Sequence, residues 1–221
     1  MSNKLNETKD VAIFFHGYAE DFDSIYGHTK RRNAWQKFLD KYFRESMRIR
    51  FDVANKYAGE NNIQSILDVG CGGGVYCEAL LEKGKTVTGI DIAEGMISLA
   101  RKKTSRFDNT GRINYIHDSY LSHKFNTKFD AAFLTGFFDY IKYPLEIFEK
   151  LQTDVSKELY MSFPKSGGIL GWQRKIRYRM RNCPLYYYSE KDIQSLLTKM
   201  EWLEKATIIS IKRDFFVRVA F

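Results

Sequence analysis

Apolar residues in the first part of the chain recur at spacings of three and four, which is the period of one face of an amphipathic helix. This face comprises Trp35, Phe38, Leu39, Tyr42, Phe43 and Met47. Thr29 is the expected N-cap of that helix and Gly59 its expected end. A shorter helix rich in aromatic side chains is predicted over 11–26. The pattern therefore predicts an N-terminal helical cap over residues 1–58.

From residue 59 onward, short apolar runs alternate with amphipathic stretches, which indicates strands that alternate with helices. We predict strands over 65–69, 86–90, 113–116, 129–134, 159–163, 202–211 and 214–220. Helices are predicted over 75–83 and 93–103, from Pro144 onward, and after the capping signal from Ser189 to Asp192.

Strands that alternate with helices form a mostly parallel sheet covered on both faces. The last two strands are joined by only a few residues, so they must be antiparallel neighbours. The expected α/β fold is therefore a Rossmann-like, doubly wound sheet of seven strands, six of them parallel and one antiparallel in the last hairpin. This domain is expected over residues 59–221, with a lid insertion at 167–188.

Composition and charge restrict the classes of partner and metal site that the chain is expected to have. The chain has 221 residues and a formal net charge of +8, but 30–50 carries +6 and 171–181 carries +5, so the rest of the chain is net negative. Such segments indicate either a local anionic partner or two solvated faces. The cysteines and histidines show no metal-ligand spacing, so we expect free thiols and no metal site. We see no signal peptide and no apolar run long enough to span a bilayer, so we expect a cytoplasmic protein.

The strongest chemical signal is the stretch from Asp68 to Gly74, DVGCGGG, in which a buried strand runs into glycines and then into a helix. Glycines allow a tight turn and a close approach to a ligand, and ligands of open α/β sheets bind beyond the carboxyl ends of the strands. The dinucleotide pattern G-x-G-x-x-G fails, because its third glycine would fall on Val75 or Cys77. A phosphate P-loop ending in Gly84-Lys85-Thr86 also fails, because Ala79 stands where its first glycine is required.

Asp91 ends the second predicted strand and follows the glycines at the distance expected of a ribose-binding acid. Asp68, the glycines after it and Asp91 together resemble motif I and the strand-two acid of the class I S-adenosylmethionine-dependent methyltransferases, in particular the small-molecule members. The resemblance covers about residues 60–221 and implies S-adenosyl-L-methionine (SAM) as the cofactor.

The resemblance also implies which residues hold the cofactor. Asp118, after the third strand, is expected to contact the adenine amino group, and Thr135 follows the fourth strand beside the transferring methyl group. Tyr18 or Tyr26 is expected near the methionine end, because methyl transfer needs a cap against water and 11–26 holds the densest aromatic residues. The alternative is that 11–26 packs on the back of the sheet. The full expected set is Asp68, Gly70, Cys71, Gly72, Asp91, Ile92, Met96, Asp118, Ser119, Thr135, Tyr18 and Tyr26.

The acceptor is less well specified. His16, Asp139 and Tyr140 are candidates for positioning or deprotonating it, with an ordinary structural role as the competing interpretation for each. The amino-methylation motif Asn/Asp-Pro-Pro-Tyr/Phe is absent, since the stretch from Thr135 to Phe138 occupies its place. No Pro-Cys dipeptide supports 5-methylcytosine chemistry.

Three hypotheses of function follow. The leading one is methyl transfer to a small-molecule acceptor with an oxygen, nitrogen or carbon nucleophile, for which an anionic acceptor is one option. An RNA methyltransferase that uses 30–50 and 171–181 is the alternative, although nucleic acid is the less expected partner because the corresponding motifs are missing. The third is a module that holds the cofactor without catalysis. Contact of the second basic segment with a membrane surface is less favoured than a solvated lid helix.

Overall fold

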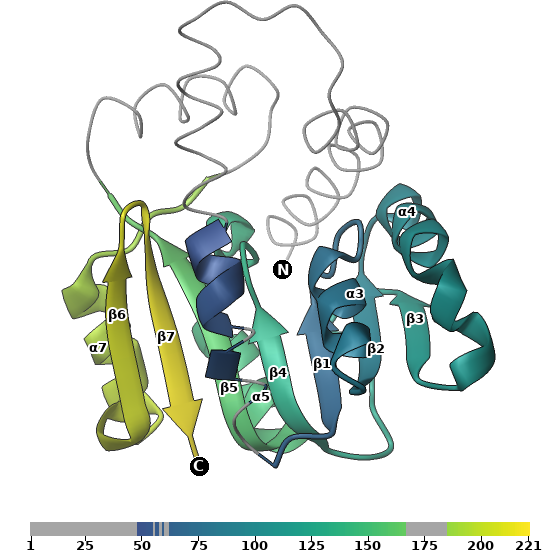
Figure 1. Cartoon of the computed structure of the whole chain (residues 1–221). Coiled ribbons are helices and arrows are strands. Elements are labelled where there is room, and N and C mark those ends of the chain that lie inside the picture. Colours follow the sequence, from purple (N-terminus) through teal and green to yellow (C-terminus); the bar gives the residue numbers. More distant parts are fainter. Residues whose placement is uncertain (1–47, 55, 58, 60–61, 167–184) are drawn as a thin grey trace, which may run out of the picture.

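The computed structural model describes residues 48–54, 56–57, 59, 62–166 and 185–221. Seven strands form one sheet in the order β3-β2-β1-β4-β5-β7-β6 (Figure 1). The strands are β1 (Ser65–Val69), β2 (Thr86–Asp91), β3 (Ile113–His117), β4 (Phe129–Leu134), β5 (Val155–Pro164), β6 (Ala206–Ile211) and β7 (Asp214–Ala220). The helices are α3 (Val75–Glu82), α4 (Glu94–Thr104), α5 (Leu145–Asp154) and α7 (Glu190–Lys199), and the 3-10 turns are η1 (Ser105–Thr110), η2 (Phe138–Tyr140) and η3 (Leu203–Lys205).

The strand directions confirm the predicted fold class. Strands β1 to β5 pair in parallel with one another, whereas β7 pairs antiparallel with both β5 and β6. Strand β6 therefore runs with the first five strands, and β7 is the single antiparallel strand of the seven. Of the predicted cap, only part of its C-terminal end is described, and 48–54 is helical as expected.

Several element boundaries differ from the sequence prediction. Residues Leu203–Lys205 form the turn η3 instead of the start of a strand, so β6 begins only at Ala206. Strand β5 begins at Val155, directly after α5, and therefore earlier than the predicted strand over 159–163. The prediction missed its first residues because exposed polar side chains there hide the strand pattern. Pro144 is the N-cap of α5 and not its first helical residue. The predicted capping box of α7 is present, with Ser189 and Asp192 each bonded to the other's backbone.

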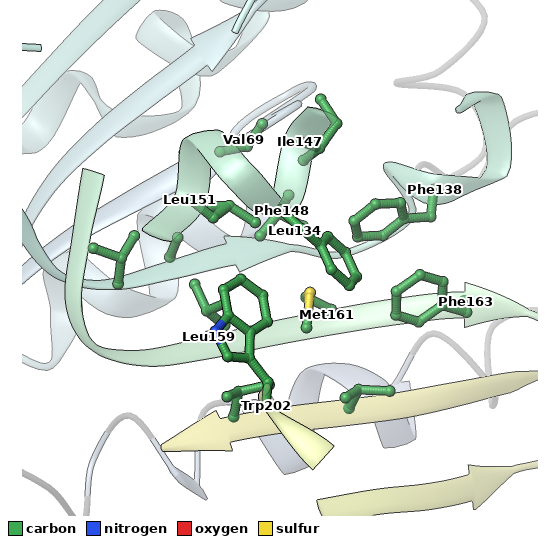
Figure 2. Packing of buried hydrophobic residues seen from close by; sticks show 14 of the residues in the cluster. Val69, Leu134, Phe138, Ile147, Phe148, Leu151, Leu159, Met161, Phe163 and Trp202 are labelled. Atoms are coloured by element: carbon green, nitrogen blue, oxygen red, sulfur yellow. The ribbon is translucent and has the colours of Figure 1, made fainter. Parts of the chain in front are cut away.

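Side chains that alternate along the strands divide the core into two layers, as the period of two in a strand requires. On one face, Leu134 and Met161 pack with Phe148 of α5 and with Trp202 (Figure 2). On the other face, Phe133 and its neighbours pack against α3, α4 and the helical segment at 48–54. A sheet covered on both faces leaves mainly the ends of its strands open to a ligand.

One carboxylic acid lies inside this core. Asp68, near the end of β1, is only 1% exposed, and its Oδ2 accepts a hydrogen bond from Cys77 Sγ of α3 at 3.2 Å. Burial is the main cause that raises the pKa of Asp68 to about 7, and the nearby carboxylate of Asp91 acts in the same direction. The hydrogen bond from Cys77 opposes them.

We expect Asp68→Asn to gain stability relative to the wild type as the pH rises. A carboxyl group in an unfolded chain has a pKa of about 4, so the folded state binds more protons between there and the raised folded value, and wild-type stability falls across that range. Denaturant unfolding of the ligand-free proteins measures this effect. The free energy of unfolding of Asp68→Asn minus that of the wild type should increase by about 1–3 kcal/mol from about pH 5 to about pH 8.

The exposed residue Asp108 provides the matched control, because Asp108→Asn removes a carboxylate that is not buried. Its difference from the wild type should not depend on pH in this way. A difference for Asp68→Asn that stays constant across the same range would contradict a raised pKa at this position.

Candidate functional site

The candidate site lies where the connections of the sheet change direction. Strand β1 pairs with β2 on one side and with β4 on the other, and the chain passes outward through β2 and β3 before it returns to β4. Open α/β sheets bind ligands at such a switch point, beyond the carboxyl ends of the strands. The turns that follow β1 and β4 meet there. A Cβ atom on Gly70 would lie 2.8 Å from the ring of Phe137.

The turn after β1 has the backbone that its glycines permit. Gly70, Gly72 and Gly74 have φ angles of 69°, 51° and 77°, in the left-handed region that side chains with a Cβ atom disfavour. Gly74 also packs closely, since a Cβ there would lie 2.9 Å from Ala100 Cβ of α4. At Gly72, in contrast, a Cβ would meet nothing within 4 Å. The turn is therefore packed against protein at both ends and has open space in its middle.

Asp91, at the end of β2, holds this turn in place. Its Oδ2 accepts a hydrogen bond from the backbone N–H of Gly72 at 2.9 Å, and its Oδ1 accepts one from Ala93 N–H at 2.9 Å. Burial raises the pKa of Asp91, while backbone hydrogen bonds from Ala93, Gly72 and Ile92 counteract that rise. Each carboxylate oxygen has two lone pairs, so the carboxylate keeps acceptor capacity beyond the bonds that the protein makes with it.

Asp118 directly follows β3, the strand that pairs with β2 and therefore lies beside Asp91. Its Oδ1 accepts from Ser119 N–H at 2.7 Å, and its Oδ2 lies 3.0 Å from His123 Nδ1. The hydrogen bond with His123 is the main cause that holds the pKa of Asp118 below its usual range. The side chain of Asp118 is 43% exposed, so a ligand can reach its remaining acceptor positions.

The other described members of the expected cofactor set differ in exposure. Ile92, Ser119 and Thr135 are half-buried at the carboxyl end of the sheet. Cys71 and Met96 are buried, and a hydrogen bond with Cys77, together with burial, raises the pKa of the Cys71 thiol. The side chains of Cys71 and Met96 therefore face protein and not solvent.

The turn after β4 is held in place by the buried side chain of Arg50 and by Ser162. In the sequence prediction, Arg50 was included only as a member of the basic segment 30–50. Gly136 N–H donates to Ser162 Oγ at 2.8 Å, and the guanidinium of Arg50 donates to the same oxygen at 3.3 Å. Arg50 also lies 3.5 Å from Asp214 Oδ2, at the start of β7. Within the described part of the chain, its Nε is buried without a hydrogen-bond partner.

Arg50 is charged despite its burial. Burial alone would lower its pKa, but Tyr76, Asp214 and Asp139 together raise it. The guanidinium thus joins the helical segment at 48–54 to the ends of β4, β5 and β7.

The turn η2 carries two of the expected catalytic candidates. Asp139 is buried and Tyr140 half-buried. The carboxylate of Asp139 acts on Arg50, as described above, and also raises the pKa of Tyr188, for which burial is the main cause. Tyr186 N–H donates to the Asp139 carbonyl at 2.8 Å. The end of the predicted lid, which contains both tyrosines, is therefore docked beside Asp139.

Other predicted positions lie outside the described residues. These are His16, Tyr18, Tyr26, the aromatic segment at 11–26, nearly all of 30–50, and 171–181. The described residues contain no group of three or more His, Cys, Asp or Glu side chains that could hold a metal ion. No helix in the same residues is long and apolar enough to cross a membrane.

Comparisons with known proteins point to one family. A family model described as a methyltransferase domain matches residues 66–154. The chain is 30% identical over 120 residues to the mitochondrial ubiquinone biosynthesis O-methyltransferase of Schizosaccharomyces pombe, which covers 53% of this chain and 39% of that protein. It is 39% identical over 67 residues to the ubiquinone biosynthesis O-methyltransferase of Hydrogenovibrio crunogenus, over 30% of this chain and 27% of that protein.

The chain spans between 22% and 52% of the length of the first curated relatives that it matches. Among solved structures, magnesium protoporphyrin IX methyltransferase from Synechocystis PCC 6803 with bound SAH has a TM-score of 0.75 at 18% identity, over 97% of this chain and 99% of that one. The N-methyltransferase NodS from Bradyrhizobium japonicum has a TM-score of 0.58 at 16% identity, over 80% and 96% of the two chains.

At such identities these two structures establish the fold alone, while the match of the family model includes the glycine turn and Asp91. Fold, motif and relatives agree. Residues 66–154 therefore form a methyltransferase domain, within the fold of the class I S-adenosylmethionine-dependent methyltransferases.

Proposed function

We propose that this protein transfers a methyl group from SAM to a small-molecule acceptor. The observation that carries the proposal is the junction of Asp91 with the glycine turn at the switch point of the sheet. There a carboxylate fixed by Gly72 and Ala93 still has acceptor positions for two ribose hydroxyls.

The residues present fit the cofactor. The open space at Gly72 allows a ligand to approach the backbone of the turn. Asp91 would hold the ribose, and Asp118, one strand further out, would face the base. The turn after β4, at Thr135 and Gly136, would lie beside the methyl group. Solved structures of similar fold contain SAH or SAM.

The chain's contribution to the chemistry is mainly alignment. When bound, SAM supplies a methyl carbon that the acceptor's nucleophile takes while the carbon–sulfur electron pair stays with sulfur. The protein must place the two reacting atoms in line and exclude water. Arg50 and Ser162 serve this purpose by fixing Gly136 in the turn that would border the methyl group.

A hydroxyl acceptor must also lose a proton, and we assign that role to Asp139. Its carboxylate lies on η2, next to the turn after β4, and is close enough to the guanidinium of Arg50 to interact with its charge. Tyr140 and the docked residues 186–188 would form the wall against which the acceptor lies. His16 remains a second candidate for this proton.

The relatives support a small molecule as the acceptor. The names of these relatives refer to ubiquinone biosynthesis and to magnesium protoporphyrin IX, and both ubiquinone and this porphyrin are small molecules. Of the two described arginines of the first basic segment, Arg50 is buried beside Asp214 and is not available to phosphate groups, whereas Arg48 is exposed. A cap over 1–58 and a lid over 167–188 would enclose the acceptor.

We expect calorimetry to detect binding of SAM and of S-adenosylhomocysteine (SAH). Asp91→Ala should weaken SAH binding by about 1.5–3 kcal/mol, because the ribose hydroxyls lose a charged acceptor. Since the variant also releases the N–H of Gly72, the specific test is an SAH analogue without the 2′ hydroxyl. Removing that hydroxyl should cost the wild type more affinity than it costs Asp91→Ala.

The control for charge alone is Glu94→Ala, because Glu94 is an exposed carboxylate at the start of α4. It should bind SAH as the wild type does. If neither SAM nor SAH produces heat with the wild type, the proposed function is wrong. An equal cost of the missing hydroxyl in wild type and Asp91→Ala would refute the ribose assignment.

We further expect the tritiated methyl group of SAM to appear in a small molecule when the enzyme is given a panel of phenols, aromatic carboxylic acids, amines and RNA. For a hydroxyl acceptor found in this way, Asp139→Asn should lower kcat by about 10²–10⁴-fold, since a general base contributes about that much. Its SAH affinity should match the wild type, which verifies folding.

Asp108→Asn, at an exposed carboxylate on η1, should retain full activity. If the tritium label appears only in RNA, the acceptor is RNA and not a small molecule. A protein that binds SAH but labels nothing in the panel would argue for a cofactor-binding module without catalysis. Unchanged kcat in Asp139→Asn would remove Asp139 from the mechanism.

A further inference from the structure

The carboxylate of Asp118 is oriented from two directions. One oxygen accepts from Ser119 N–H at 2.7 Å, and the other faces His123 Nδ1 at 3.0 Å. An ionised carboxylate can only accept hydrogen bonds, so Nδ1 is the donor. The side chain of Ser122 adds a further hydrogen bond to this carboxylate. With both oxygens engaged, the plane of the carboxylate is fixed, and because its side chain is 43% exposed, a ligand can still reach it.

His123 is itself held by its surroundings. Its backbone N–H donates to the Ser119 carbonyl at 3.0 Å. Its ring meets the ring of Phe125 edge-on at a centroid distance of 4.8 Å, and Phe125 in turn packs edge-on against Phe129 at 5.2 Å. The imidazole is only 27% exposed. These contacts anchor the His123 side chain to the core at the start of β4, so its direction does not depend on Asp118.

Asp118 stands one strand away from the group assigned to the ribose. Its backbone N–H donates to the Asp91 carbonyl at 3.1 Å, and Asp91 pairs with His117 in the register of β2 and β3. Adjacent strands lie about 4.8 Å apart. A nucleoside whose ribose binds Asp91 can thus present its base to Asp118.

We propose that His123 is a positioning residue that aims Asp118 at the exocyclic amino group of a 6-aminopurine and so sets the preference of the site for adenine nucleosides. This inference rests on the proposed binding of SAM. A carboxylate free to rotate would accept from the amino group in only part of its orientations, whereas the fixed one is prepared for it before the ligand arrives. The preference should therefore depend on His123 even though His123 does not touch the ligand.

The experiment measures Kd by calorimetry for SAH and for its analogue with hydrogen in place of the 6-amino group. The wild type should prefer SAH by about tenfold or more, as expected for a hydrogen bond to a charged acceptor. Asp118→Ala should abolish most of that preference. His123→Ala should reduce it to about threefold or less while the Kd of the analogue changes by less than about twofold.

Two further variants separate positioning from a general structural effect. His123→Asn places an amide nitrogen at about the position of Nδ1, so it should restore most of the preference. Lys124→Ala, at the exposed neighbouring residue, should leave both affinities unchanged. The ratio of the two Kd values is the decisive quantity, because damage to the fold would weaken both ligands together.

The inference is overturned if His123→Ala keeps the wild-type ratio, or if it weakens SAH and the analogue equally. It also fails if Asp118→Ala retains the preference, because Asp118 would then not contact the amino group. Each of these results would leave SAH binding, and with it the proposed function, intact. If the wild type does not bind SAH at all, the proposed function fails and this inference with it.

Discussion

The candidate site depends on one carboxylate that accepts hydrogen bonds from two segments of backbone. Asp91 bonds to Gly72 in the turn after β1 and to Ala93 before α4, so the end of β2 fixes both. The turn needs this support because its left-handed glycines have more conformational freedom to lose than other residues. Because we propose that the same carboxylate binds ribose, the geometry of the proposed ribose site depends on that of the glycine turn.

Two buried ionisable groups near the site, Asp68 and Arg50, have opposite surroundings. Asp68 lies near the glycine turn with a thiol as its hydrogen-bond donor, and burial is the main cause of its raised pKa. At the end of β4 the opposite case holds, because Asp214, Asp139 and Tyr76 interact with Arg50 and keep it charged. Burial thus disfavours the charge of Asp68, whereas neighbouring groups stabilise the charge of Arg50.

The fold and the position of Asp91 beside the glycine turn could be predicted because their signals are local. Apolar alternation fixes the strands, and the glycines with Asp68 and Asp91 occupy short stretches at the ends of two neighbouring strands. The start of β5 and the turn η3 were mispredicted because polar side chains obscure the first and the apolar Leu203 imitates a strand in the second. Arg50 was missed as an individual residue, although its spacing from Phe43 and Met47 places it on the apolar face of the predicted helix.

The acceptor half resists prediction for a physical reason. Its defining contacts join residues far apart in sequence, such as Arg50 with Ser162 across 112 positions and Tyr186 with Asp139. No spacing within a single element encodes such a pair, because each partner has the local environment of an ordinary helix or strand residue. His123 is a milder case. It lies only five residues from Asp118, yet its role follows from the packing of its ring on Phe125 and not from any motif. Cofactor identity can therefore be inferred from the chain alone, whereas the groups that select a ligand emerge only once the strands bring distant segments together.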